Sequence, residues 1–112
     1  MELNKSEKKI ARMLISKALE KECGTFLKDA EKLLQQEKTE SEHERYLRLY
    51  KRVDDFDEYI ASRYDRLGGS RYPVVVAGLF CDGVLQEEDI EQFSNETQEW
   101  LMKIRTHFRN SL

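Results

Sequence analysis

Hydrophobic residues in the first third of the chain recur every three or four positions, which predicts a long amphipathic helix. Asn4 or Ser6 could cap its start, because either side-chain oxygen can accept a hydrogen bond from a first-turn backbone N–H. The pattern predicts that residues 1–38 form the first helix, with its regular turns running from Lys5 to about Lys38. The apolar positions are Ile10, Leu14, Ala18, Cys23, Phe26, Leu27, Ala30, Leu33 and Leu34.

The next stretch, QQEKTESEHE, has no apolar residue, so it is predicted to be the turn between two helices. Ser41 followed by Glu44 fits a capping box, which begins a second helix over residues 41–67. The apolar residues of this helix step by three and four, which is the spacing of a coiled-coil seam. This predicted dimer seam consists of Tyr46, Leu49, Val53, Phe56 and Ile60.

The length of these two helices bears on assembly. Helices of roughly 25 to 35 residues are about 40 to 50 Å long, whereas a compact domain of this size is only ~30 Å across. The helices must therefore bend back or pack on a second copy. The seam favours the second possibility, a homodimer through the two long antiparallel helices.

Glycine and proline positions shape the remaining third of the chain. Gly68-Gly69 is predicted to end the second helix in a left-handed cap, and Pro73 suits a first helical turn. The run PVVVAGLF could be a buried strand, but the chain offers no second strand to pair with it. We therefore expect a buried helix over residues 72–81, closed at Gly83.

Two more helical pieces follow. Residues 86–92 are expected to form a short acidic turn of helix, because carboxylates interact favourably with the partial positive charge at a helix N-terminus. Ser94 is predicted to cap a last amphipathic helix, with apolar positions at Trp100, Leu101, Ile104 and Phe108. The fold class expected is all-α: two long antiparallel helices plus a small head of two or three short helices over residues 72–109. A single domain would span residues 1–112.

Composition excludes several kinds of protein. Charged residues make up 37% of the chain and hydrophobic ones 39%, which is typical of helices that have one solvent-exposed face. The net charge is -3 and residues of both signs are interspersed, which is unlike the clustered basic surface of a nucleic-acid-binding protein. The local cations Arg45, Arg48, Lys51 and Arg52 lie among acids and are interpreted as a solvated or pairing face. No apolar run approaches the ~18 residues of a membrane span.

The expected location is cytoplasmic, because MELNKSEKK lacks the features of a signal peptide. Cys23 and Cys81 lie in different predicted elements and are expected to be reduced thiols.

Candidate chemistry is sparse. Gly68-Gly69-Ser70 could cradle a phosphate but lacks the Gly-Lys-Ser/Thr of a P-loop. His43 and His107 are isolated, and neither has a second metal ligand one turn away. A dyad of Cys81 with His107 stays open as an alternative. The acids of the second helix are expected to be solvated. We therefore expect no enzyme activity, no catalytic residues, no metal and no cofactor.

Several strings resemble the fluorescence recovery protein family of cyanobacteria and its relatives. ARMLISKALEKECGTFL is similar to the family's first helix, and Arg63-Tyr64-Asp65 is similar to the Lys-Tyr-Asp that ends its second. The clearest likeness is AGLFCDGVLQEEDIEQF, which resembles the family's Phe-Ala-x-Leu-Leu-x-Glu-Gly-x-Leu-x-x-Glu-Glu-Leu stretch. The positions in register there are Ala77, Leu79, Phe80, Asp82, Gly83, Glu88, Asp89 and Ile90.

The resemblance implies an all-α homodimer without enzyme activity. Family members bind the orange carotenoid protein and accelerate its return from the light-activated to the resting form, which ends photoprotective quenching. Such control of populations and rates needs only preferential binding of one conformer or of the relaxation barrier, without chemistry. The resemblance thus implies a carotenoid-binding photoprotective protein, or another regulatory protein, as the partner. The alternative is a helical dimer that binds a small molecule or stress signal beneath the helix over residues 72–80.

The implied partner-binding face lies on the second helix, at Leu47, Tyr50, Lys51, Asp57, Tyr64 and Asp65. The family's Trp, Asp and Arg important for the interaction correspond to Leu47, Lys51 and Asp57. The charge is reversed at Lys51 and at Asp57, so a partner surface complementary to the family would meet like charge. Whether these two swapped charges pair within this protein is open.

Overall fold

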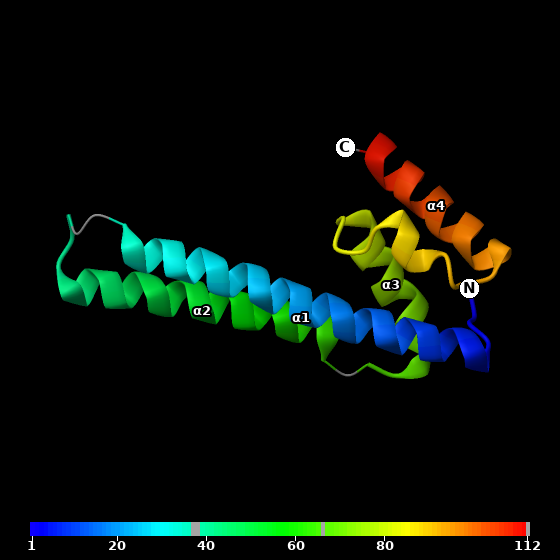
Figure 1. Ribbon diagram of the computed structural model, residues 1–112, viewed down its shortest axis with the longest axis horizontal. Helices are drawn as coiled ribbons and strands as arrows, with labels where there is room; N and C mark the ends of the chain where they lie inside the picture. Colours follow the sequence, from blue (N-terminus) through cyan, green and yellow to red (C-terminus); the bar gives the residue numbers. More distant parts are fainter. Residues whose placement is uncertain (37–38, 66, 112) are drawn as a thin grey trace. The chain divides into compact units, whose positions relative to one another are not determined.

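The computed structural model describes residues 1–36, 39–65 and 67–111, and every regular element within them is helical, which confirms the all-α prediction (Figure 1). The predicted first-helix end at residue 38, and residues 37 and 66, lie outside these ranges. No helix in the described ranges has the length and apolar character to cross a membrane. The elements are α1 (Lys5–Gln35), α2 (Glu42–Tyr64), η1 (Gly69–Arg71), α3 (Tyr72–Cys81), η2 (Glu87–Ile90) and α4 (Asn95–Asn110), where η marks a 3₁₀ helix.

The chain divides into two compact units. The terminal unit consists of Met1–Leu19 together with Arg66–Leu112, and the central unit consists of Glu20–Asp65. The first part of α1 belongs to the terminal unit and the rest of it belongs to the central unit. The single domain expected from chain length stays a prediction.

Short polar side chains begin three of the helices, as predicted. Asn4 Oδ1, rather than the alternative Ser6, accepts a hydrogen bond from the Glu7 N–H at 2.8 Å. Ser41 Oγ accepts one from the Glu44 N–H at 3.1 Å, and Ser94 Oγ one from Thr97 at 3.3 Å. Each cap satisfies one of the backbone N–H groups that a helix start leaves without a partner.

The end of α2 differs from the prediction. The helix ends at Tyr64, and the Asp65 backbone is extended, with φ -76° and ψ 150°, while its N–H still donates to the Ala61 carbonyl. Gly68 is also extended, and Gly69 begins η1. The predicted left-handed glycine cap is therefore wrong, because an extended residue that needs no glycine already ends the helix.

The core of the terminal unit is built around α3. Pro73 occupies its first turn, where a missing N–H costs nothing. Gly83, with φ 79°, closes the helix in the left-handed region, so both sequence predictions here are confirmed. Only one side of α3 reaches solvent, which is why the run reads as apolar throughout. The buried α3 residues are Tyr72, Pro73, Val75, Val76, Ala77, Leu79 and Phe80.

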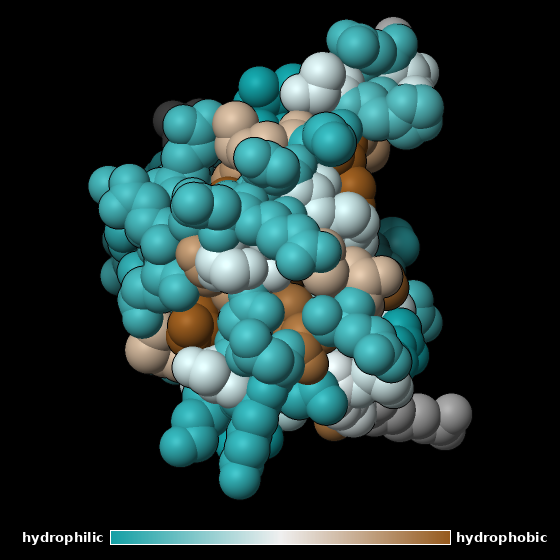
Figure 2. All heavy atoms as spheres, turned by 90° about the vertical axis from the view of Figure 1, so that its right-hand side faces the viewer, coloured by the Kyte–Doolittle hydropathy of each residue, from teal (hydrophilic) through white to brown (hydrophobic). Residues whose placement is uncertain are grey.

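Other elements of the terminal unit cover this core. α4 packs along α3 (Figure 1), and the Arg105 guanidinium lies 4.3 Å from the centre of the Phe80 ring. Lys17 forms an ion pair of 3.0 Å with Asp89. Figure 2 shows one face of the molecule, on which small hydrophobic areas appear between hydrophilic side chains. The α1 residues that are buried in this unit are Ala11, Leu14, Ile15 and Ala18, together with the carboxylate of Glu7.

Glu7 ties the start of α1 to the start of α4. Its side chain is only 7% exposed, and Oε2 accepts hydrogen bonds from Thr97 Oγ1 at 2.6 Å, Ser94 Oγ at 3.1 Å and the Ser94 N–H at 3.2 Å. Burial acts to raise the pKa of Glu7, but the hydrogen bonds together outweigh it and lower the pKa. The ionised carboxylate is thus the form that the fold favours.

Candidate functional site

The outer face of α2 carries a row of exposed apolar side chains, which we call the exposed stripe: Tyr46, Leu47, Tyr50 and Val53. Tyr46 and Tyr50 are each 61% exposed, and Leu47 and Val53 are each 47% exposed. Spacings of three and four place these residues on neighbouring rows of one helix surface. Two members come from the predicted dimer seam and two from the predicted partner-binding face.

The opposite side of α2 faces α1 within the central unit. The rings of Phe26 and Phe56 stack with their centres 4.3 Å apart, and Arg45 Nη2 donates to the Leu34 carbonyl at 2.8 Å. Leu49, Phe56 and Ile60 are half-buried. The structure therefore divides the predicted seam: these three residues are partly covered inside the chain, whereas Tyr46 and Val53 are exposed.

α1 adds apolar surface to the central unit. Leu27 is 65% exposed and Leu34 is 50% exposed, although the sequence pattern assigned both to the apolar stripe of the first helix. Each of them follows a residue that faces α2. Because successive residues of a helix are rotated by about 100° about its axis, Leu27 and Leu34 point away from the contact with α2. α1 and α2 run antiparallel, because the contacts that lie later in α1 involve residues that lie earlier in α2. In an antiparallel pair, the residues that follow the facing positions lie on the same side of both helices. Leu27 and Leu34 therefore lie on the same side as the exposed stripe.

In the middle of α2, residues 45–58, the charges form two blocks on either side of Val53, basic before it and acidic after it. Glu42 and Glu44 precede the basic block, and Arg63 follows the acidic one. Lys51 pairs with Asp55 at 3.2 Å, one turn along the helix. The predicted site residue Asp57 is exposed, and the structure does not bring it together with Lys51 in one chain. The basic block contains Arg45, Arg48, Lys51 and Arg52, and the acidic block contains Asp54, Asp55, Asp57 and Glu58.

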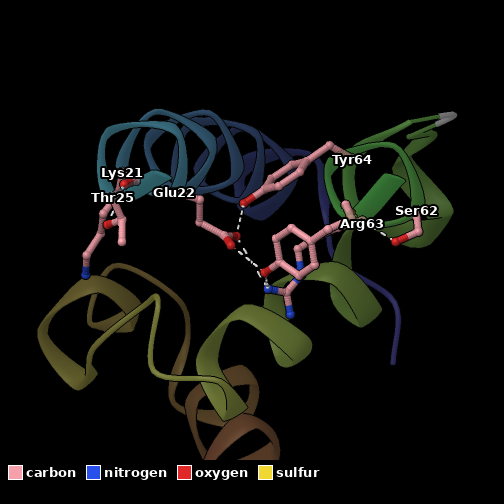
Figure 3. A network of polar contacts seen from close by, with 7 residues as sticks. Lys21, Glu22, Thr25, Ser62, Arg63 and Tyr64 are labelled. Atoms are coloured by element: carbon pink, nitrogen blue, oxygen red, sulfur yellow. Dashed lines mark hydrogen bonds and ion pairs between the residues drawn. The ribbon is translucent and has the colours of Figure 1, made fainter. Parts of the chain in front are cut away.

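A polar network lies near the end of α2 (Figure 3). The Tyr64 hydroxyl donates to Glu22 Oε1 at 2.6 Å, and Arg63 Nη1 lies 3.4 Å from the same oxygen. Tyr59 donates to the other carboxylate oxygen, and the Arg63 guanidinium lies 5.2 Å from the centre of its ring. The three α2 side chains thus converge on one α1 carboxylate.

Tyr64, one of the predicted partner-binding residues, is hydrogen-bonded to Glu22 in this network. Burial, and then the hydrogen bond to Glu22, raise the pKa of Tyr64 well above its usual range. Asp65 is exposed where α2 ends. Partner binding by Tyr64 and Asp65 stays a prediction. Sequence reasoning missed Glu22, although its place one turn before Phe26, on the apolar face of the first helix, was a signal.

Other groups give little support for chemistry. Burial, and then the neighbouring Asp82 carboxylate, raise the pKa of the Cys81 thiol, which disfavours the reactive thiolate. Both cysteines are free thiols. Within residues 1–36, 39–65 and 67–111, no three His, Cys, Asp or Glu side chains gather closely enough to hold a metal ion.

Two pockets bear on the alternative of a small ligand. One of about 70 Å³ lies at the turn between α1 and α2, lined by Leu33, Leu34, Gln36, Thr39, Glu40, Arg45 and Arg48. Another of about 270 Å³ is lined by Met1, Glu2, Leu3, Lys8, Gly69, Ser70 and Pro73. Neither corresponds to the cavity expected beneath α3, where Val76, Leu79 and Phe80 are at most 2% exposed and pack into the core.

Comparisons of the chain with models of protein families, with curated proteins and with solved structures find no significant match.

Proposed function

We propose that this protein is a non-enzymatic, homodimeric regulatory protein that acts by binding another protein, in the manner of the fluorescence recovery protein family. The observation that carries the proposal is the exposed apolar face of the central unit, formed by the exposed stripe with Leu27 and Leu34. Large apolar side chains exposed on one face of a helix pair are typical of a protein interaction site.

A second copy is the occupant that fits this face best. Its side chains project from two packed helices, so two such pairs can close into a four-helix bundle around a shared core. Full burial of one large apolar side chain contributes about 1.5 to 3 kcal/mol. Several such side chains on each copy provide enough to offset the cost of association, which is estimated at about 4 to 15 kcal/mol.

Regulation would follow from selective binding rather than from chemistry. A dimer that binds one conformer of its partner more tightly than the other shifts their populations. A dimer that binds the relaxation barrier more tightly than the activated conformer also speeds the return. Because Lys51 and Asp57 reverse the family's charges, the partner surface is expected to carry the opposite charge pattern to the carotenoid protein that the family binds.

The assembly is tested by sedimentation equilibrium over a range of micromolar concentrations. We expect a particle of twice the 13.3 kDa chain mass. A particle that keeps the mass of one chain at every concentration would overturn the homodimer.

The regulatory role is tested by mixing the purified protein with light-activated orange carotenoid protein and following its colour change in the dark. Acceleration of the return to the resting form would support the photoprotective role. If the rate is unchanged, but becomes faster after Lys51→Asp and Asp57→Arg are introduced together, the dimer is a regulator whose partner differs in charge. No effect of either protein would reject the photoprotective role.

A further inference from the structure

The segment between α2 and α3 contains Gly68-Gly69-Ser70, which could cradle a phosphate but has no lysine of its own. In a P-loop, a lysine that directly follows the glycines reaches the phosphate oxygens, where it acts as a point charge. In this structure a lysine reaches the glycine segment from another element. Lys8, near the start of α1, lies against Gly69, and both residues belong to the terminal unit.

The absence of a side chain at Gly69 lets this lysine come close. A Cβ atom at position 69 would lie 3.5 Å from Lys8 Cδ and Cε and 3.6 Å from its Nζ. Lys8 is exposed, and its ammonium group forms no ion pair with any residue in the described part of the chain. A positive charge therefore lies beside the glycine segment, and no carboxylate of the described residues pairs with it.

A hollow of about 270 Å³ lies at this contact. Lys8 and Ser70 contribute a cation and a hydroxyl group to its lining, whereas Leu3 and Pro73 contribute apolar surface. An ammonium group and a hydroxyl group are both hydrogen-bond donors that phosphate oxygens accept from. The volume lies just below the ~300 to 1,000 Å³ that is usual for small-molecule sites. The hollow thus suits a small anionic group.

The side of α1 that carries Lys8 is rich in cations. Lys5, Lys8, Lys9 and Arg12 recur at spacings of three and four, which places them on one side of the helix. Within residues 1–36, 39–65 and 67–111, Lys5 and Lys9 form no ion pair either. Arg12 Nε donates to the Tyr72 hydroxyl at 3.3 Å, so this row of cations reaches the start of α3. Clustered charge of one sign raises the local concentration of anions.

We propose that this hollow binds a terminal phosphate group, with Lys8 and Ser70 as the donors. Gly69 provides the space, because a residue without a side chain lets other groups approach its backbone closely. The site divides between two elements what a P-loop holds in one segment, so the spacing of residues along the chain did not reveal the lysine. All of its residues belong to the terminal unit, so the inference is independent of the proposed homodimer and adds a ligand to it.

Isothermal titration calorimetry of the full chain at constant ionic strength tests the site, with inorganic pyrophosphate as the probe. We expect one saturable site per chain. Lys8→Gln should weaken binding at least about tenfold, because it removes a charge-assisted hydrogen bond. Lys103→Gln is the matched control, since it removes the same charge from α4 of the same unit. The control should change the affinity less than about twofold, because salt screens distant exposed charges.

Glu2 provides a test of opposite sign. Its carboxylate also lines the hollow and opposes the binding of an anion. Glu2→Gln should therefore tighten the binding of pyrophosphate by up to about fivefold, which is the size expected for one exposed charge pair. Circular dichroism verifies that every variant keeps its helix content, so that weaker binding cannot be attributed to unfolding.

A terminal phosphate group can belong to a soluble molecule or to a lipid headgroup, and a second probe distinguishes these sources. Vesicles that contain phosphatidate are mixed with the protein and floated on a density gradient. Binding of pyrophosphate alone would identify a soluble ligand, and binding of the vesicles alone a lipid headgroup, provided that Lys8→Gln weakens it. If neither probe binds, or if Lys8→Gln and Lys103→Gln weaken binding equally, the inference is overturned, while the proposed regulatory dimer is unaffected.

Discussion

The terminal and central units use their hydrophobic residues in opposite ways. Among the described residues, every buried hydrophobic side chain except Tyr64 belongs to the terminal unit. The central unit instead exposes Leu27, Leu34 and the whole exposed stripe. Both units are helical and rich in charge, so helix content alone does not distinguish them. The terminal unit therefore buries its hydrophobic side chains within one chain, and the exposure in the central unit supports the proposal that a second copy covers it.

The largest expected effect lies in the terminal core. Phe80→Ala should lower the free energy of unfolding by about 3 to 5 kcal/mol, because it removes a fully buried ring and leaves a cavity. Val74→Ala is the matched control on the same helix, since Val74 is 65% exposed and should cost within about 0.5 kcal/mol. Urea unfolding followed by circular dichroism measures both. Equal costs would mean that α3 is not the centre of the core.

Acid should weaken the terminal unit through Glu7. The pKa of Glu7 is lowered in the folded state, so the stability it contributes is present above the ordinary carboxylate range and is lost as pH falls through the folded value. Glu7→Gln should cost about 1.5 to 3 kcal/mol at pH 7, because its three hydrogen bonds lose their charge. The difference from wild type should shrink at pH 3. A constant difference across this range would contradict the assignment.

Base should weaken the central unit through Tyr64. The pKa of Tyr64 is raised in the folded state, so its contribution is present below about pH 10, the ordinary value for tyrosine, and is lost as pH rises further. Absorbance at the wavelength of tyrosinate should show one tyrosine that ionises well above the ordinary range. Glu22→Gln should bring the Tyr64 transition closer to the ordinary range of tyrosine and cost about 1 kcal/mol of stability. An unchanged titration would show that Glu22 is not coupled to Tyr64.

A last effect of similarly small size concerns charge at the central surface. Asp54→Lys/Asp57→Lys should raise the dimer dissociation constant about tenfold at low salt, which corresponds to ~1.4 kcal/mol. Added salt should reduce the difference, because it screens exposed charge. Glu88→Lys/Glu99→Lys makes the same change on the terminal unit and should leave the constant unchanged. Equal effects of the two variants would indicate a general response to net charge.

Local rules account for much of the fold. Ser41 and Ser94 as caps, Pro73 in a first turn and Gly83 at a helix end were all predictable, because each satisfies a backbone requirement set by its immediate neighbours. The helix over residues 72–81 followed from the absence of a strand partner. The left-handed cap predicted from the glycine pair after α2 was wrong, because glycine permits such a cap without requiring one.

Tertiary contacts account for what the sequence did not show. The hydrogen bonds of Glu7 to Ser94 and Thr97 join residues almost a whole chain apart, and Glu22 meets Tyr64 across two helices. Periodicity identified the apolar residues of the first two helices but not which of them α1 and α2 cover in each other. The exposure of Leu27 and Val53 depends on the rotation of each helix about its axis, which a three-and-four spacing leaves open.

The most direct test of the central claim compares the mass of two multiple variants by sedimentation equilibrium. Tyr46→Ser/Tyr50→Ser/Val53→Ser removes three of the four apolar side chains of the exposed stripe, and Met13→Ser/Val74→Ser/Met102→Ser removes three exposed apolar side chains from the terminal unit as a control. We predict that the first variant has the mass of one chain with its helix content intact, while the control keeps twice that mass. A stripe variant that remains dimeric, or a control that dissociates equally, would contradict the claim that the central unit is completed by a second copy.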